Sequence, residues 1–178
     1  MALVLDLREM RRPEDRIERT YPAATFAAGR SDDYAVADSV ALALRVRKDG
    51  EKCRISGHVR TTLALSCSRC LERFEMPENL AVDLLYLPDS ANRGASDSEI
   101  AEEDLSIAFY RDYQIDLRQL VHEQCQLALP MKPLCRDACH GLCPVCGTNL
   151  NERACNCDTA WRDPRLAVLG TLVGGRQH

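Results

Sequence analysis

The chain has 178 residues, 28% of them charged, and a net charge of −4 at pH 7. This length fits one domain, or one domain with a small appendage, and the low aromatic content of 5% means that aliphatic side chains must fill the core. A negative net charge disfavours a protein that holds nucleic acid by its overall charge, so any RNA contact needs a local basic patch. No stretch approaches the length of a membrane span, and we expect no membrane partner.

Residues 1–34 are predicted to form an N-terminal arm. Leucines at every second position from Leu3 to Leu7 indicate a short strand. The run from Arg11 to Arg19 then mixes both charge signs, which is typical of a solvated face. Contact between these arginines and phosphate is the alternative that the pattern leaves open.

Residues 35–130 are predicted to form an antiparallel β-sheet covered by one or two helices, which is an α+β arrangement. Apolar and polar residues alternate from Val40 to Val46 and again from Leu80 to Tyr86, and this period of two gives each strand one apolar face. The Asp49-Gly50 pair is a strong signal for a hairpin turn between strands.

A polar and acidic stretch, residues 88–104, is predicted to be a mobile, solvent-facing loop between two strands. A helix is expected to follow from Asp116, whose carboxylate can cap the first turn, with Gln119 completing a capping box. Pro130 ends this helix, which we expect to cover the sheet. A second, short helix is predicted to begin at Asp163-Pro164.

Residues 131–178 form a predicted cysteine-rich segment, with six cysteines between Cys135 and Cys157. The motif Cys143-Pro-Val-Cys146-Gly147 has the form of a zinc knuckle, because two closely spaced thiolates and a glycine allow a tight turn around a metal. Two further cysteines follow a turn-rich spacer and complete a tetrahedral, four-thiolate set for Zn²⁺: Cys155 and Cys157.

A second CxxC motif, Cys67-Ser-Arg-Cys70, stands at the end of a predicted strand without another pair nearby. It can be a redox dithiol, although its flanks lack a strand-to-helix pattern, or a pair of buried thiols. The more economical prediction is a second metal site with Cys135 and Cys139, which ties the sheet to the C-terminal segment. We therefore expect one zinc ion, and two if this site forms. The remaining cysteines are assigned to the core: Cys53 and Cys125.

Disulfides and buried free thiols are the alternatives to metal for this cysteine-rich chain. Disulfide-dense chains are usually small and secreted. Here no apolar run typical of a signal peptide follows the N-terminal methionine, and acids interrupt the early arginines. We therefore expect a cytoplasmic protein in a reducing compartment, where clustered thiols more often hold a metal.

The motifs occur in a definite order along the chain. They are Cys67-Ser-Arg-Cys70-Leu71, Ile115-Asp116-Leu117, Cys135-x3-Cys139, Gly141-Leu-Cys-Pro-Val-Cys-Gly147, Asn149-Leu-Asn151 and Asp163-Pro-Arg165-Leu166. Over roughly residues 35–173 this order resembles the YceD family of bacteria and plastids, and the block from Gly141 to Asn151 is the most specific part. The family is implicated in accumulation of large-subunit ribosomal RNA and is described as non-enzymatic or uncharacterised. The resemblance therefore implies a role in ribosome biogenesis.

Three classes of function follow from these patterns. The first is a non-catalytic factor for large-subunit (23S) rRNA accumulation, processing or ribosome assembly, in which the knuckle and three cations contact RNA or ribosomal and assembly proteins: Lys132, Arg136 and Arg153. The second is a zinc-stapled adaptor that contacts only proteins. The third, an enzyme with a small-molecule substrate, is disfavoured because all-cysteine zinc sites are closed and the chain has only four histidines.

Overall fold

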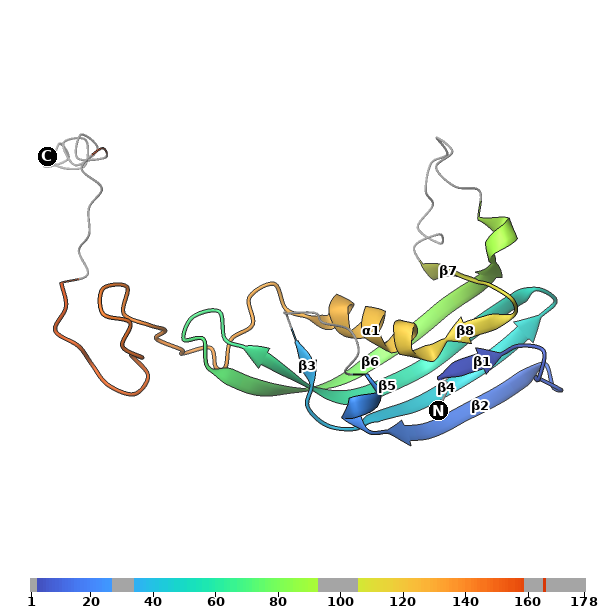
Figure 1. Ribbon diagram of the computed structural model, residues 1–178, viewed down its shortest axis with the longest axis horizontal. Helices are drawn as coiled ribbons and strands as arrows, with labels where there is room; N and C mark the ends of the chain where they lie inside the picture. The colour runs from blue at the N-terminus through green and yellow to red at the C-terminus, as the bar shows by residue number, and fades with distance from the viewer. Residues whose placement is uncertain (1–2, 27–33, 93–105, 159–164, 166–178) are drawn as a thin grey trace, which may run out of the picture.

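The computed structural model describes residues 3–26, 34–92, 106–158 and 165. These residues form a six-stranded sheet, a two-stranded ladder, one α-helix and a cysteine-rich segment that continues beyond one end of the sheet (Figure 1). The strands are β1 (Val4–Asp6), β2 (Glu14–Tyr21), β3 (Ala35–Val36), β4 (Val40–Asp49), β5 (Lys52–Ser66), β6 (Arg73–Pro88), β7 (Ile107–Tyr110) and β8 (Gln114–Asp116). The helices are α1 (Leu117–Ala128) and the 3₁₀ turns η1 (Ala23–Thr25) and η2 (Asp89–Ala91).

The main sheet has the order β2-β4-β5-β6-β7, with β3 paired to β5. All of its neighbouring strands are antiparallel except β6 and β7, which run parallel from Leu85↔Ile107 to Pro88↔Tyr110. The expectation of a purely antiparallel sheet is therefore wrong at this edge. Alternation of apolar and polar residues fixes which face a strand buries but not its direction, and the long connection after β6 permits a parallel neighbour.

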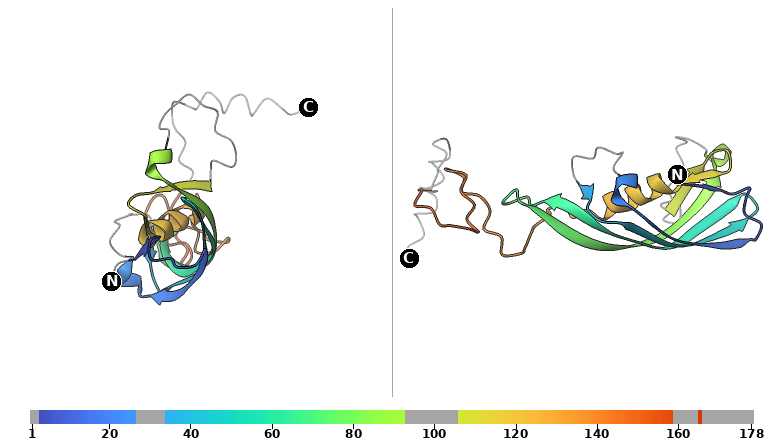
Figure 2. Two further views of the ribbon diagram at one scale, coloured as in Figure 1. Left: turned by 90° about the vertical axis from the view of Figure 1, so that its right-hand side faces the viewer. Right: turned by 60° about the horizontal axis from the view of Figure 1, so that its bottom comes forward.

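The β5–β6 hairpin is the element that positions the cysteines. Its ladder extends without interruption from Cys53↔Tyr86 to Ser66↔Arg73, and the turn beyond it contains the first CxxC motif. In Figures 1 and 2 this long hairpin projects toward the cysteine-rich segment. The hairpin predicted at Asp49-Gly50 is confirmed between β4 and β5: Asp49 pairs with Lys52, and the loop consists of Glu51 and Gly50, whose φ of 59° is accessible to glycine without strain.

The core lies between one face of the main sheet and a layer formed by α1 with the β1–β8 ladder. Figure 2 shows the sheet curving around the helix. Alternate residues of β4 and β5 are buried, as are Leu117, Leu120, Val121 and Cys125 on the inner side of α1. Burying each such side chain contributes roughly 1.5–3 kcal/mol, so the sheet and helix supply most of the stability. Both cysteines that the sequence assigns to the core, Cys53 and Cys125, are fully buried.

Residues 3–26 of the segment interpreted from the sequence as an N-terminal arm lie in the fold. Leu3 and Leu7 are buried in the core, and β2 forms an edge of the main sheet from Glu14↔Arg47 to Tyr21↔Val40. Six of the eight residues of β2 are charged or threonine, so the segment has no clear strand pattern. A charged edge strand protects a sheet from pairing with other chains, which accounts for this composition.

The helix α1 begins and ends where the sequence predicts. The Asp116 carboxylate accepts hydrogen bonds from the backbone N–H groups of Arg118 at 2.8 Å and Gln119 at 3.3 Å. The predicted capping box is wrong in its second half, because the Gln119 side chain donates to Glu123 along the helix instead. The predicted helix at Asp163 and most of the predicted acidic loop lie outside the described residues.

Candidate metal centres

Eight of the ten cysteines lie in two groups of four. In each group all four sulfur atoms lie within 4.8 Å of one another. The hairpin cluster consists of Cys67, Cys70, Cys135 and Cys139. The terminal cluster consists of Cys143, Cys146, Cys155 and Cys157. These are the same two sets that cysteine spacing predicts, and no histidine belongs to either set among the described residues.

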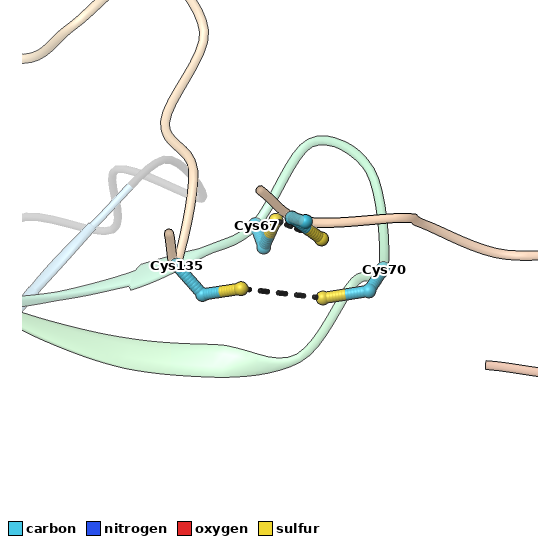
Figure 3. Close-up of side chains that lie close together, drawn as sticks. Cys67, Cys70 and Cys135 are labelled. Atoms are coloured by element: carbon cyan, nitrogen blue, oxygen red, sulfur yellow. Dashed lines mark hydrogen bonds between the residues drawn. The ribbon is translucent and has the colours of Figure 1, made fainter. Parts of the chain in front are cut away.

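The sulfur spacing in the hairpin cluster fits a tetrahedral metal site. Cys67 Sγ lies 3.8 Å from Cys139 Sγ, and Cys70 Sγ lies 3.7 Å from Cys135 Sγ (Figure 3). Four Zn–S bonds of about 2.3 Å in tetrahedral geometry place the sulfurs about 3.8 Å apart, whereas a disulfide joins sulfurs at about 2.05 Å. Four converging thiols at this spacing can hold a zinc ion, and all ten cysteines are unpaired.

The two CxxC motifs adopt the same backbone turn. In the hairpin cluster, the Leu71 N–H donates to the Cys67 carbonyl at 2.9 Å and the Cys67 N–H donates to the Glu72 carbonyl at 2.9 Å. In the terminal cluster, the Gly147 N–H donates to the Cys143 carbonyl at 2.9 Å, and the Cys143 N–H donates to the Thr148 carbonyl at 2.8 Å. The residue after the second cysteine has positive φ in both, 62° at Leu71 and 72° at Gly147. Leu71 therefore occupies a position that favours glycine.

Replacing Leu71 by glycine is expected to stabilise the protein by about 0.5–1 kcal/mol. The left-handed conformation costs an L-residue roughly 1–2 kcal/mol, which exceeds the entropic cost of a glycine, and the mostly exposed Leu71 loses little packing. The matched change Gly147→Ala should destabilise by about 1 kcal/mol, because an added Cβ meets no atom within 4 Å and only the backbone effect remains. Urea unfolding of both variants tests this pair, and shifts of the same sign would contradict it.

The loop after α1 is fastened to the end of the hairpin. The Pro133 carbonyl accepts hydrogen bonds from the Ser68 N–H at 2.8 Å and the Ser68 hydroxyl at 3.1 Å. The Arg69 guanidinium donates to the backbone carbonyls of Cys139 at 2.9 Å and Asp137 at 3.3 Å. These contacts bring Cys135 and Cys139 to the hairpin, and the resulting cluster is largely buried.

The segment from Gly141 to Asn151 connects the two clusters. The Asn151 amide donates to Cys139 Sγ at 3.3 Å, and its oxygen accepts from the His140 N–H at 2.9 Å. Leu142 N–H donates to the Arg69 carbonyl at 3.1 Å. Gly141 has a φ of 75°, and an added Cβ would lie 3.0 Å from that same carbonyl oxygen, so both conformation and space favour glycine there. The sequence does not predict these hydrogen bonds of Asn151; the only local signal is the Asn149-Leu-Asn151 pattern.

The thiols within each cluster resist ionising together. Burial raises the pKa of Cys67, but hydrogen bonds from nearby backbone N–H groups outweigh it and lower that pKa to about 6. Burial and the neighbouring thiols raise the pKa of Cys135 to about 12. In the terminal cluster, Thr148 lowers the pKa of Cys146 to about 6, and Cys146 in turn is the main cause that raises the pKa of Cys157 to about 12. Four thiolates this close need a cation between them.

The three cations predicted to bind a partner lie on the surface of this segment. Lys132, Arg136 and Arg153 are all exposed. Arg136 is also part of the fold, because its guanidinium donates to the Asn151 side chain at 2.9 Å. Their proposed contact with RNA or protein stays a prediction.

Fold and cysteine geometry together define a sheet protein with two four-cysteine groups at one end of its longest hairpin. The family model described as large ribosomal RNA subunit accumulation protein YceD matches residues 55–173. The chain therefore belongs to the YceD family, as the order of its motifs indicates. The matched residues include the β5–β6 hairpin from Ile55 onward, α1 and all eight clustered cysteines.

Curated relatives are similar over most of this chain. An uncharacterized protein of Mycobacterium tuberculosis is 34% identical over 75% of the chain and 61% of its own length. The large ribosomal RNA subunit accumulation protein YCED homolog 1, chloroplastic, of Arabidopsis thaliana is 28% identical over 79% of the chain and 50% of its own length. The Zea mays homolog of the same name is 28% identical, with coverages of 66% and 48%. The chain thus spans less than two thirds of these relatives.

No solved structure matches the chain. Among the described residues, no helix has both the length and the apolar character that crossing a bilayer requires.

Proposed function

We propose that this protein is a non-catalytic factor that supports accumulation of large-subunit (23S) rRNA by binding RNA or ribosomal and assembly proteins. The observation that carries the proposal is the family match across the hairpin, α1 and both cysteine clusters. The names of the Arabidopsis and maize relatives supply the link to large-subunit rRNA. Its site of action is proposed to be the cytoplasm, where thiols stay reduced.

The proposal assigns one zinc ion to each cysteine cluster. The hairpin cluster would fasten the C-terminal segment to the sheet, and the terminal cluster would fold residues 143–157 around its own ion. Zinc bound by four thiolates is a structural centre with no open coordination position for water or substrate. The absence of histidine from both sets, among the described residues, supports a structural role over a catalytic one.

A protein-binding adaptor without RNA contact is the second candidate. The observation that favours it is a set of large apolar side chains exposed around the cysteine end: Leu71, Leu127, Met131 and Val145. Large apolar side chains left exposed are available for contact with a partner protein. Salt dependence separates the candidates, because RNA binding through phosphates weakens steeply with added salt, whereas apolar docking does not.

Deleting the gene is expected to lower mature large-subunit rRNA relative to small-subunit rRNA, without a new modification pattern in that RNA. A variant with all four histidines changed to glutamine (His58, His122, His140 and His178) should restore the ratio, since the proposal gives none of them chemistry. A Cys143→Ser/Cys146→Ser variant should not. Quantifying both rRNAs in the complemented strains is the test. A folded histidine variant that fails to rescue would point back to an enzyme, and rescue by the cysteine variant would separate metal from function.

A further inference from the structure

The face of the main sheet that points away from α1 carries five arginines on strands β2, β4 and β5. Strand register aligns Arg16 of β2 with Arg45 of β4, and Arg47 of β4 with Arg54 of β5. Arg60 lies on the same face of β5, six residues from Arg54 and therefore about 20 Å away. All five side chains are exposed. We call this surface of β2, β4, β5 and β6 the outer face.

Only part of this positive charge is neutralised within the protein. Arg54 pairs with Asp83 at 2.7 Å, and Arg45 pairs with Glu14 at 3.3 Å. Among the described residues, no carboxylate lies within 4.0 Å of the guanidinium groups of Arg16, Arg47 and Arg60. Glu14, Glu18 and Asp83 lie on the same face as the five arginines, so the outer face keeps a positive surplus, although the chain as a whole carries −4.

Two pairs of these arginines stand directly opposite one another on neighbouring strands, and Glu14 stands on the other side of Arg47. Like charges directly opposite on neighbouring strands destabilise the pair, and Arg16 with Arg45 and Arg47 with Arg54 are two such pairs in adjacent rows. A bound polyanion would remove this repulsion. Charge complementarity therefore favours an anionic partner on this face.

The cysteine-rich segment, residues 131–158, which we call the cysteine end, has no positive surplus. Its three cations are balanced by Asp137, Glu152 and Asp158. Each divalent metal with four thiolates adds a net charge of −2 when both sites are filled. The side chains of Arg69 and Arg136 are already used for hydrogen bonds within the fold. Charge therefore favours the outer face over this end as a phosphate surface, while the predicted contact of Lys132, Arg136 and Arg153 remains untested.

We infer that the outer face of the sheet is where this protein binds the phosphate backbone of RNA, an inference that rests on the RNA branch of the proposed function. On the part of the face that runs from Arg16 and Arg45 to Arg60, the strand register places His58 but no Phe, Tyr or Trp, so there is no platform for stacking several bases there. Ala43 and Ser56 line a shallow depression of about 250 Å³ whose rim carries Arg16 and Arg45 together with one acid, Glu18. This surface suits double-helical RNA, in which the backbone is exposed and the bases are stacked away.

The test compares two triple variants of equal charge in the full chain loaded with zinc. The first is Arg16→Gln/Arg47→Gln/Arg60→Gln on the outer face. The comparison variant, Arg118→Gln/Lys132→Gln/Arg153→Gln, removes three exposed cations elsewhere and includes the competing candidates Lys132 and Arg153, so the pair decides between the two surfaces. A 20-base-pair RNA hairpin is titrated at several salt concentrations, and circular dichroism checks that both variants fold.

The outer-face variant should bind about a hundredfold more weakly near 0.1 M salt, with a log–log salt slope reduced by about 2–3, because each phosphate contact contributes roughly 0.7–0.9 to that slope. The control should lose less than about fivefold. Equal loss in both variants, or loss in the control alone, would overturn the inference while RNA binding itself stood. A wild-type protein that does not bind the hairpin would overturn both the inference and the RNA branch, leaving the protein-binding adaptor.

Discussion

Replacing Cys143 or Cys146 by serine is expected to unfold the C-terminal cysteine segment while the sheet stays folded. Residues 131–158 contain no helix or strand of the described set beyond the isolated bridge Leu142↔Asn149, and few of their side chains are buried. A structural zinc ion contributes on the order of 10 kcal/mol to the folding of such a unit, more than packing in this segment can replace. Limited proteolysis and metal content measure the effect.

The matched control for this experiment is a cysteine that no cluster contains. Cys53 is fully buried in the core, so Cys53→Ala should cost roughly 1–2 kcal/mol of global stability through lost packing but keep the full metal content. The serine variants should instead lose one metal equivalent and become cleavable between residues 131 and 160. Full metal content together with unchanged protease resistance in Cys143→Ser would contradict the account of the terminal cluster.

The second large effect concerns the hairpin cluster. Cys67→Ser and Cys135→Ser should each remove one metal equivalent, and the double variant should remove no more than that. The reason is that both sulfurs belong to one four-sulfur group, although one lies on the β5–β6 turn and the other follows α1. Removing either ligand leaves three thiols that hold zinc poorly.

Losses that add in the double variant would show that the two cysteines serve different sites. No loss from either would make these thiols buried structural residues, which was the alternative considered for the CxxC motif. A further readout follows from the contact between Asn151 and Cys139 Sγ. Asn151→Leu should leave the metal count at two but weaken metal retention against a chelator, because outer contacts orient metal ligands.

The hairpin with Gly50, the capped helix α1 and the grouping of eight cysteines could be predicted from the sequence because each is encoded locally or by spacing. Asp-Gly sets its own turn, Asp116 caps its own helix, and a CxxC pair places two thiols side by side. The terminal cysteines already supply four ligands for one metal ion. Cys135 and Cys139 therefore remain as the partners of the CxxC motif in the hairpin turn.

Other features depend on parts of the chain that are far apart. The charged strand β2 is a strand only because β4 offers a free edge. The parallel pairing of β6 with β7 is a matter of topology, which residue alternation does not encode. The outer face depends on register, which places Arg16, Arg47 and Arg60 of three different strands on one side of the sheet.

The positive φ of Leu71 is a local feature that could not be predicted from the sequence. Its turn matches that of Gly147 in hydrogen bonding and φ, but a leucine gives no signal for positive φ. The similarity of the two turns lies in backbone conformation and hydrogen bonding, which the residue types do not encode.

The central claim is that eight cysteines hold two metal ions and thereby join the C-terminal segment to the sheet. Native mass spectrometry with elemental analysis, on full-length protein purified under reducing conditions without added metal, tests it most directly. We predict two zinc ions per chain, one of them lost in Cys67→Ser and the other in Cys143→Ser. A metal-free chain that is folded and protease-resistant through residue 158 would contradict the claim.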